Sequence, residues 1–203
     1  MYIVRPSYLL RQLYPKAIWR VPTTQKKIYL TFDDGPVPHI TSWVLDVLKK
    51  EEIKATFFCV GENVSKNPSI YQRILAEKHA VGNHTYNHMN GWNAHGNQYL
   101  RNVVKCAEVV NSKLFRPPYG RIKKSQLALI SKQYSVIMWD VLSGDYDKNT
   151  SKVQCLKNVT DHVRNGSIVV FHDSYKAQNN MEYALPKFIK FAKEKGFVFE
   201  VLK

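Results

Sequence analysis

Hydrophobic and polar residues alternate along this chain with two different spacings. Short apolar runs typical of buried strands are followed by stretches whose apolar residues recur every three or four positions, as on one face of a helix. The run 134–139 has little polar alternation, which is typical of a strand buried on both faces. The predicted strands are 27–33, 55–60, 80–84, 114–116, 134–140, 167–171 and 197–202, and the predicted helices are 40–51, 68–78, 97–112, 123–132, 151–164 and 181–195.

The order of these elements predicts the fold class. Strands that alternate with helices favour an α/β domain with a mostly parallel sheet. About seven strands are too many for a minimal three-layer sheet and too few for a regular eight-fold barrel, so a barrel-like or irregular closed sheet fits best. The last helix contains Pro186, and because proline is tolerated in the first turn, the start of this helix is predicted near Leu185.

The first 25 residues differ from the rest of the chain. Three prolines interrupt them, and they follow neither the strand nor the helix pattern. We therefore expect an irregular N-terminal arm at 1–25 that wraps the domain, with one short helix near 8–14. Residues 26–203 are expected to form a single domain.

Two adjacent carboxylates end the first predicted strand. Asp33 and Asp34 precede Gly35-Pro36, through which a strand cannot continue, so the backbone bends directly after them. Neighbours in a regular strand point to opposite faces, but a bend here lets both side chains reach one cleft with separate roles. The alternative is an ordinary solvated Asp-Gly turn.

Ionisable residues also follow other predicted strands, at the ends where the active sites of parallel barrels lie. His84 and His88 are four residues apart, a spacing that lets two imidazoles bind one metal ion. With Asp34 they make two histidines and one carboxylate, a set that binds zinc and other divalent metals and leaves positions open for water and substrate. The alternative is a pair of surface histidines in a loop.

Three further strand ends carry candidate residues. Arg116 precedes two prolines that stiffen the backbone, so its guanidinium can orient a neighbouring carboxylate and lower the pKa of that carboxylate. An Asp in 140–146 can hold a histidine in one tautomer, and His172 leaves an apolar strand at the margin of the core. The alternatives are a proline-rich turn, a solvated Ser-Gly-Asp turn and a core histidine bonded to the backbone.

These strand ends together resemble the conserved motifs of the polysaccharide deacetylase family, also called the NodB homology domain or carbohydrate esterase family 4. The resemblance extends over 27–203 and keeps the family's motif order. It implies a distorted (β/α) barrel, in agreement with the alternation of elements, and a catalytic domain at 26–203. The matching segments are Thr31-Phe32-Asp33-Asp34-Gly35-Pro36, His84-Thr85-Tyr86-Asn87-His88, Arg116-Pro117-Pro118-Tyr119-Gly120, the segment around Asp145, and Val170-Phe171-His172.

The resemblance also implies a cofactor and its ligands. Asp34, His84 and His88 correspond to the residues that bind a divalent metal, commonly zinc, in this family. Other divalent ions are used by some members. The resemblance therefore implies a metal-dependent hydrolase.

Catalytic roles follow from the same resemblance. Asp33 corresponds to the general base, held by Arg116, and His172 to the general acid, held by Asp145. The backbone N–H of Tyr119 corresponds to a group that helps bind the oxyanion.

The chain departs from the family's pattern around its pocket. The fourth motif usually has Asp-x-x-Asp-Trp, whereas this chain has Leu142 in place of the first Asp and Tyr146 in place of Trp. The usual Leu of the fifth motif is Val170. The usual Trp and Leu line the pocket for the acetyl methyl group or the sugar, so these departures affect the acyl pocket and the substrate preference.

Charge and cysteine content narrow the possible partners. Lys and Arg number 30 against 16 Asp and Glu, a net charge of +14, which attracts anionic partners or serves solubility. The basic residues are scattered, which argues against a nucleic-acid partner. Three cysteines without a CxxC pair argue against a disulfide framework and a cysteine zinc site.

The sequence indicates neither a membrane span nor an export signal. No apolar run reaches about 18 residues, and the N-terminus has no pattern of a signal peptide. The location is left undetermined, although family members often act in the cell envelope or outside the cell. The oligomeric state is open as well.

The predicted function is removal of acetyl groups from N-acetylated sugars of a peptidoglycan-like or chitin-like glycan, with release of acetate. An O-deacetylase on acetylated glycan is an alternative, because no residue here separates amide from ester. A catalytically silent carbohydrate-binding domain is another. A basic nucleic-acid-binding domain would need a contiguous Lys and Arg face, which the scattered charge does not favour.

Overall fold

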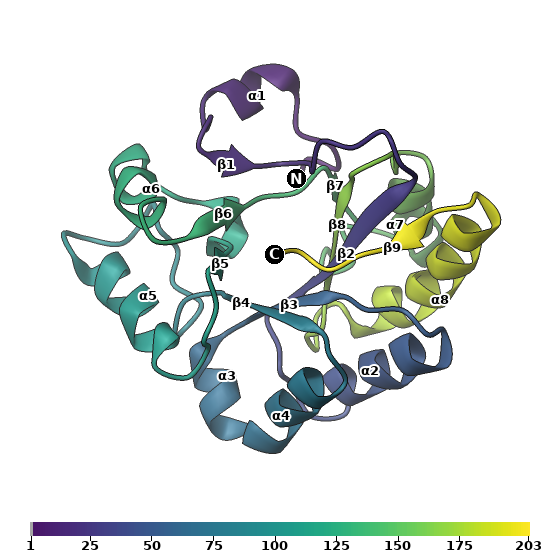
Figure 1. Ribbon diagram of the computed structural model, residues 1–203, viewed down its shortest axis with the longest axis horizontal. Coiled ribbons are helices and arrows are strands. Elements are labelled where there is room, and N and C mark those ends of the chain that lie inside the picture. The colour runs from purple at the N-terminus through teal and green to yellow at the C-terminus, as the bar shows by residue number, and fades with distance from the viewer. Residues whose placement is uncertain (1) are drawn as a thin grey trace.

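The protein is built around one curved sheet (Figure 1). The computed structural model describes residues 2–203, and in this range nine strands form a sheet whose neighbouring strands pair in parallel. The strand order is β1-β6-β5-β4-β3-β2-β8-β7, and β9 pairs with β2. The strands are β1 (Ala17–Ile18), β2 (Lys27–Asp33), β3 (Thr56–Cys59), β4 (Ala80–Asn83), β5 (Leu114–Phe115), β6 (Ser135–Ile137), β7 (Val141–Leu142), β8 (Ile168–His172) and β9 (Val198–Phe199).

The helices lie outside this sheet, so the molecule is an incomplete (β/α) barrel (Figure 1). The predicted fold class is confirmed, with nine strands where the sequence indicated about seven. Among residues 2–203 no helix combines the length and the apolar character that crossing a membrane requires. The helices are α1 (Tyr8–Gln12), α2 (Ile40–Lys50), α3 (Gly61–Lys66), α4 (Pro68–Ala76), α5 (Gln98–Ala107), α6 (Lys124–Ile130), α7 (Lys152–Thr160), α8 (Gln178–Glu194) and the 3₁₀ helix η1 (Pro118–Gly120).

The main hydrophobic core lies between the outer face of the sheet and the helices. Phe32 of β2 and Phe57 of β3 stack with ring centroids 5.1 Å apart, and both are buried. Val44, Leu45 and Leu48 of α2 belong to the same cluster and are fully buried. Burial of each such side chain stabilises the fold by roughly 1.5–3 kcal/mol. This layer fixes the strands in place and leaves their alternate residues facing the barrel interior.

The barrel interior contains an apolar layer, and the predicted site residues form a polar layer next to it at the carboxyl ends of the strands. Phe58, Ile137 and Ile168 pack there with Leu202, near the end of the chain. The backbone N–H of Leu202 donates to Thr56 Oγ1 at 3.0 Å, and Figure 1 shows the C-terminus at the centre of the ring of strands. The C-terminal segment therefore fills the interior below the level of the predicted site residues.

Two predictions about helices need correction. The expected start of the last helix near Leu185 is wrong, because α8 begins at Gln178 and continues through Pro186. A buried apolar stripe lies on both sides of this proline and outweighs its cost, which is about 3 kcal/mol in a helix interior. Helix α3 is absent from the predicted elements, because its short polar sequence buries only Gly61 and Val64 and so shows no periodicity.

The N-terminal segment takes part in the sheet. The short helix expected near 8–14 is present as α1, and β1 adds a strand that pairs with β6. The backbone N–H of Leu142 in β7 donates to Val4 O at 2.8 Å, so residues before α1 lie beside the other end of the sheet. Strands β1 and β7, of two residues each, are not among the predicted strands. The domain boundary at residue 25 stays a prediction.

A buried carboxylate anchors this segment. Asp140 is fully buried and accepts hydrogen bonds from Arg11 at 2.6 Å and from Arg164 at 2.9 and 3.0 Å. Ser167 Oγ donates to it at 2.8 Å. Burial would raise the pKa of Asp140, but the bonds from Arg164, Ser167 and Arg11 lower it to about 2. Asp140 is therefore a structural ion-pair centre.

We expect Leu202→Ala to lower the free energy of unfolding by about 2–5 kcal/mol, because it leaves a cavity inside the barrel. Chemical denaturation of both proteins measures the difference. Val198→Ala, on the same terminal segment, is the matched control, since Val198 is more than half exposed and its loss should cost less than about 0.5 kcal/mol. Equal effects of the two substitutions would contradict a role of Leu202 in filling the interior.

Candidate active site

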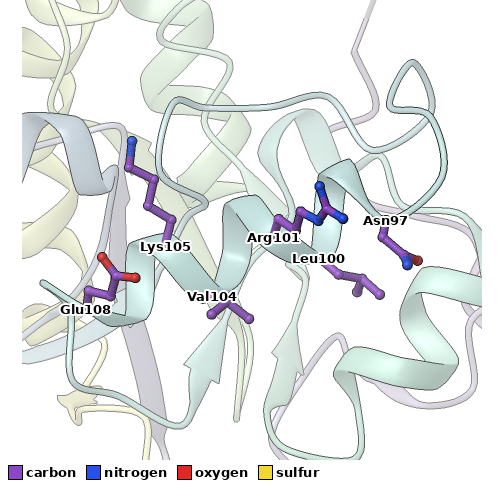
Figure 2. A pocket seen from close by; sticks show the side chains of 6 residues that line it. All are labelled: Asn97, Leu100, Arg101, Val104, Lys105 and Glu108. Carbon is purple, nitrogen blue, oxygen red and sulfur yellow. The ribbon is translucent and has the colours of Figure 1, made fainter.

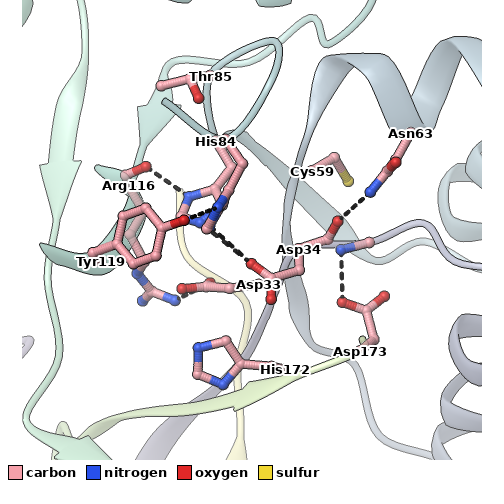
Figure 3. A network of polar contacts seen from close by, with 12 residues as sticks. Asp33, Asp34, Cys59, Asn63, His84, Thr85, Arg116, Tyr119, His172 and Asp173 are labelled. Carbon is pink, nitrogen blue, oxygen red and sulfur yellow. Dashed lines mark hydrogen bonds and ion pairs between the residues drawn. The ribbon is translucent and has the colours of Figure 1, made fainter. Parts of the chain in front are cut away.

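The carboxyl ends of the parallel strands gather the predicted site residues at one end of the barrel. Asp33 ends β2, His84 directly follows β4, Arg116 directly follows β5 and His172 ends β8. Figure 3 shows their side chains around one common space, with Asp34 between the histidines and Asp173. The site arises because every strand in the sheet runs the same way.

Asp34, His84 and His88 form a cluster suited to a metal ion. Their ligand atoms all lie within 4.8 Å of one another. Asp34 Oδ1 is 3.1 Å from His88 Nε2 and 3.8 Å from His84 Nε2. His84 Nδ1 donates to the backbone carbonyl of Arg116 at 2.7 Å, which leaves Nε2 with a free lone pair facing the cluster. His88 Nδ1 is 3.1 Å from the hydroxyl of Tyr119, so its Nε2 is oriented in the same way.

The protonation states in this cluster favour cation binding. Burial lowers the pKa of His84 to about 4, although the charges of Asp33 and Asp34 raise it, so His84 is neutral at pH 7. Burial would raise the pKa of Asp34, but the hydrogen bond with His88 and the nearby histidine charges lower it well below its usual value. A neutral imidazole and an ionised carboxylate are the forms that ligate metals. The residues present therefore fit a divalent cation.

The backbone at the cluster is held in an uncommon conformation. Asp34, His88 and Tyr119 have φ values of 88°, 56° and 61°, in the left-handed region that non-glycine residues rarely adopt. Such residues persist only where the surroundings hold them, and they concentrate at functional sites. Asn63 of α3 provides one restraint, since its Nδ2 donates to Asp34 O at 2.7 Å.

Asp33 and Arg116 form a buried ion pair beside the cluster. Arg116 Nη1 donates to Asp33 Oδ1 at 2.6 Å and to Thr31 Oγ1 at 2.8 Å. Its Nη2 donates to Met138 O at 3.1 Å, and its guanidinium lies 4.1 Å from the ring centroid of Phe58. These contacts fix the guanidinium on every side, so it holds the Asp33 carboxylate in one orientation.

His172 and Asp145 form a second pair, and His172 of β8 lies in register with Asp33 of β2. His172 Nδ1 donates to Asp145 Oδ1 at 2.8 Å, and the backbone N–H of His172 donates to Asp145 Oδ2 at 2.7 Å. Burial alone would lower the pKa of His172, but the charge and hydrogen bond of Asp145, with Asp34 and Asp33, raise it to about 9. His172 is therefore protonated at neutral pH and has an Nε2–H to donate.

The predicted pocket residues occupy three different environments. Tyr119 is largely exposed at the mouth of the site. Tyr146 packs edge-on against the His172 ring, with centroids 4.7 Å apart, and burial raises the pKa of this tyrosine to about 12, so it stays a neutral phenol. Val170 is buried in β8 on the same strand face as His172 and pairs in register with Leu142 of β7.

Asp173 is a site residue that sequence reasoning did not identify. It is buried, and its Oδ1 accepts from the Gly35 N–H at 3.0 Å while its Oδ2 accepts from the Thr41 hydroxyl at 2.6 Å. Thr41 in turn accepts from the Val37 N–H at 2.7 Å. A Cβ atom on Gly35 would collide with the Asp173 carboxylate, so glycine is required there. Asp173 therefore clamps the turn that carries Asp33 and Asp34.

Burial makes Asp173 an unusual carboxyl group. Burial, with a contribution from the charge of Asp34, raises the pKa of Asp173 to about 8. The hydrogen bonds from Thr41 and Gly35 lower this pKa but do not outweigh burial. The only signal in the sequence was its position directly after His172 at the end of an apolar strand.

Tyr2 is a second residue that the sequence did not indicate. Its ring lies 6.1 Å from the ring of Tyr146, and its hydroxyl accepts from Asn158 Nδ2 at 2.8 Å. Gly144, with φ 72°, leaves the room that the Tyr2 ring occupies, because a Cβ atom there would collide with it. The N-terminal segment thus supports the residue that packs on His172, a contact that no local pattern encodes.

Known proteins share both this fold and this sequence pattern. The family model described as polysaccharide deacetylase matches residues 20–136. A peptidoglycan-N-acetylglucosamine deacetylase of Bacillus cereus is 36% identical over 190 residues, covering 89% of this chain and 68% of that protein. A chitooligosaccharide deacetylase of Azorhizobium caulinodans is 32% identical over 163 residues, covering 76% and 77%. The crystal structure of the Bc1960 peptidoglycan N-acetylglucosamine deacetylase superposes with a TM-score of 0.89 at 33% identity, covering 97% of this chain and 95% of that one.

The chain therefore belongs to the polysaccharide deacetylase family. The family and enzyme class predicted from the motifs are confirmed: the protein is a deacetylase, a hydrolase that acts on carbon–nitrogen bonds other than peptide bonds. The roles of individual residues and the identity of the metal stay predictions.

Replacement of the Asp173 clamp should affect both stability and metal binding. We expect Asp173→Ala to lower the free energy of unfolding by about 2–6 kcal/mol, because two buried donors lose their acceptor at about 1–3 kcal/mol each. Asp173→Asn should cost less, since its amide can still accept from Gly35 and donate to Thr41. Denaturant unfolding and a zinc titration of each variant measure the two effects.

The control for this comparison is Asp161→Ala, which removes an exposed carboxylate at the end of α7 and should change stability by less than about 0.5 kcal/mol. If Asp173→Ala bound zinc with the affinity of the unaltered protein, the clamp would have no part in holding Asp34.

Proposed function

We propose that this protein hydrolyses the acetamido group of N-acetylglucosamine units in a peptidoglycan-like or chitin-like glycan, releasing acetate and a free amino sugar. The observation that carries the proposal is that Asp33, paired with Arg116, and a protonated His172 stand on neighbouring strands beside the Asp34, His84 and His88 cluster. Named relatives that act on peptidoglycan and on chitooligosaccharides support this substrate class.

The cluster is proposed to hold a divalent cation, with zinc the expected metal. Asp34 supplies one carboxylate oxygen, and His84 and His88 each supply Nε2. Three protein ligands of this kind leave coordination positions open, as in catalytic zinc sites. A cation bound there supplies Lewis-acid chemistry, which lowers the pKa of water and polarises a carbonyl oxygen.

Asp33 is proposed as the general base. Attack on the acetamide carbonyl carbon requires a water molecule that loses a proton, and the Asp33 carboxylate accepts it. Arg116 binds one oxygen of this carboxylate, which orients the other oxygen for contact with the water molecule. The backbone N–H of Tyr119 is proposed to stabilise the oxyanion that forms, a contribution of about 3 kcal/mol for a single donor.

His172 is proposed as the general acid. When the carbon–nitrogen bond breaks, the bonding electrons stay on nitrogen, and the proton on His172 Nε2 completes the amine. Asp145 holds Nδ1–H and thereby fixes the tautomer and the ring orientation. Tyr146 and Val170, near His172, are proposed to contact the acetyl methyl group or the sugar. The two complete acid and base pairs favour catalysis over a silent carbohydrate-binding role.

The proposal predicts metal-dependent acetate release. The purified protein should release acetate from N-acetylglucosamine oligomers and from peptidoglycan, lose this activity in a chelator and regain it when zinc is added. Release from acetylxylan but not from these N-acetylated glycans would support the O-deacetylase instead. The absence of release from every acetylated glycan with zinc present would overturn the proposal.

Asp33→Asn separates catalysis from metal binding. The amide can still accept a hydrogen bond from Arg116 but cannot accept the proton of water, so turnover should fall by about 10²–10⁴. Zinc affinity should stay close to that of the unaltered protein, because Asp33 is not in the ligand set. Acetate release and a zinc titration measure the two quantities, and a variant with full activity would show that Asp33 is not the base.

Asp145→Asn tests the acid. His172 must be protonated to act, so activity is kept below its pKa and is lost as the pH rises through it. Without the Asp145 charge the pKa of His172 falls from its value of about 9, and the basic limb of kcat/KM should move by about 1–3 pH units toward lower pH. A pH–rate profile with an unshifted basic limb would contradict this assignment.

A further inference from the structure

A shallow groove runs from the metal-ligand loop onto helix α5. Its volume is about 530 Å³, and it lies between Asn87, which directly precedes His88, and the N-terminal half of α5. Asn102 of α5 joins the two walls, because its Oδ1 accepts from the N–H groups of Tyr86 at 2.8 Å and Asn87 at 3.3 Å. The groove is therefore fixed to the loop that carries His84 and His88.

The side chains of this α5 groove are suited to a carbohydrate. Asn87, Asn97 and Gln98 line it with carboxamides that offer both donors and acceptors, and Asn102, whose Oδ1 already accepts from the loop, adds an amide donor. Sugar hydroxyl and acetamido groups present the same two kinds of partner. Four carboxamides in one groove beside a deacetylase site therefore match a glycan chain.

Arg101 and Lys105 add positive charge to the groove. Figure 2 shows both side chains projecting from α5 on the same side. Neither forms an ion pair with any carboxylate in the part of the chain that the structure describes, and no acidic residue from that part lines the groove. Lys105 Nζ lies 3.8 Å from the ring centroid of Tyr86, which positions the ammonium beside the metal-ligand loop.

The positive strip continues along the helix. A second hollow of about 560 Å³ shares Asn97, Arg101 and Lys105 with the groove and ends at Glu108 (Figure 2). Arg101 and Lys105 are four residues apart and so lie on one face of α5, one turn from each other. Two unpaired cations on one face, next to carboxamides, complement an anionic group on a sugar.

We propose that the α5 groove is a subsite for the glycan segment beside the reacting sugar, and that it selects sugars carrying a carboxylate. The inference rests on the proposed deacetylase function. The carboxamides bind hydroxyl and acetamido groups of the neighbouring sugars, while Arg101 and Lys105 bind the carboxylate. Because both cations are exposed, their contribution is modest, sensitive to salt and expressed mainly in KM.

The test compares two tetrasaccharides of equal length. One is the neutral N-acetylglucosamine tetramer, and in the other alternate N-acetylated sugars carry a lactyl carboxylate. Arg101→Gln with Lys105→Gln should reduce the ratio of kcat/KM for the anionic over the neutral tetramer by about three- to tenfold, through a higher KM. Raising the ionic strength should reduce this ratio in the unaltered protein.

The matched control is Lys187→Gln with Lys190→Gln, which removes the same charge from α8, on the other side of the barrel (Figure 1). An equal fall in the ratio for this control would show that the overall charge, and not the α5 groove, selects the substrate. An unchanged ratio in the Arg101 and Lys105 variant would also overturn the proposal.

Direct binding separates this proposal from the proposed function. Titration of the zinc-loaded protein with the anionic tetramer, followed by backbone NMR shifts, should perturb Asn97, Arg101 and Asn102, and the double variant should bind more weakly. Such binding without acetate release would support the subsite and reject the deacetylase function. Acetate release without shifts along α5 would support the deacetylase function and reject the subsite.

Discussion

The buried ion pair between Arg116 and Asp33 is the interaction on which the rest of the site depends. A guanidinium that is fully buried is tolerated only when it is paired and its remaining N–H groups are bonded. Here β2 supplies the carboxylate and the Thr31 hydroxyl, while backbone carbonyls at and just after β6 accept the other bonds. The ring of Phe58 covers one face of the guanidinium. Glycine is needed at position 82, because a Cβ atom there would collide with this ring. The bonds of Arg116 therefore fix the positions of these strands relative to one another and, at the same time, the orientation of Asp33.

Two consecutive carboxylates can take different roles because the turn between β2 and α2 is held from outside. In a strand Asp33 and Asp34 would point apart, but at φ 88° Asp34 turns back toward the histidines. Asn63 holds its carbonyl, and Asp173 holds the next peptide N–H. These restraints come from α3, which follows β3, and from the residue directly after β8, and β3 and β8 are the two neighbours of β2. The strained conformation is thus maintained by tertiary contacts and not by the turn itself.

The sequence predicted the site residues at the strand ends better than the residues that hold them in position. Asp33, Asp34, His84 and Arg116 could be found because each stands at a break in a clear strand pattern, and parallel strands bring such breaks to one edge. The spacing alone did not choose between the Asp residues in 140–146, and only the family resemblance pointed to Asp145; in the structure Asp145 binds His172 and Asp140 binds the arginines. Asp173, Asn63 and Tyr2 were not identified, because their contacts join residues distant in sequence. The start of the last helix was predicted wrongly, because the preference of proline for the first turn is outweighed by burial of the apolar side chains along α8.

Each of the two proposed proton-transfer groups, Asp33 and His172, is held by a buried partner of opposite charge. The buried Arg116 holds the Asp33 carboxylate in one orientation, and the buried Asp145 raises the pKa of His172 against the effect of burial. Asp33 and His172 are paired in register on the neighbouring strands β2 and β8, so the two side chains stand next to each other beside Asp34 (Figure 3). Each partner is itself fixed by backbone bonds, Arg116 through carbonyls and Asp145 through the His172 N–H. The geometry therefore sets the orientations of both groups and the protonation state of His172 before substrate binds, which is electrostatic preorganisation.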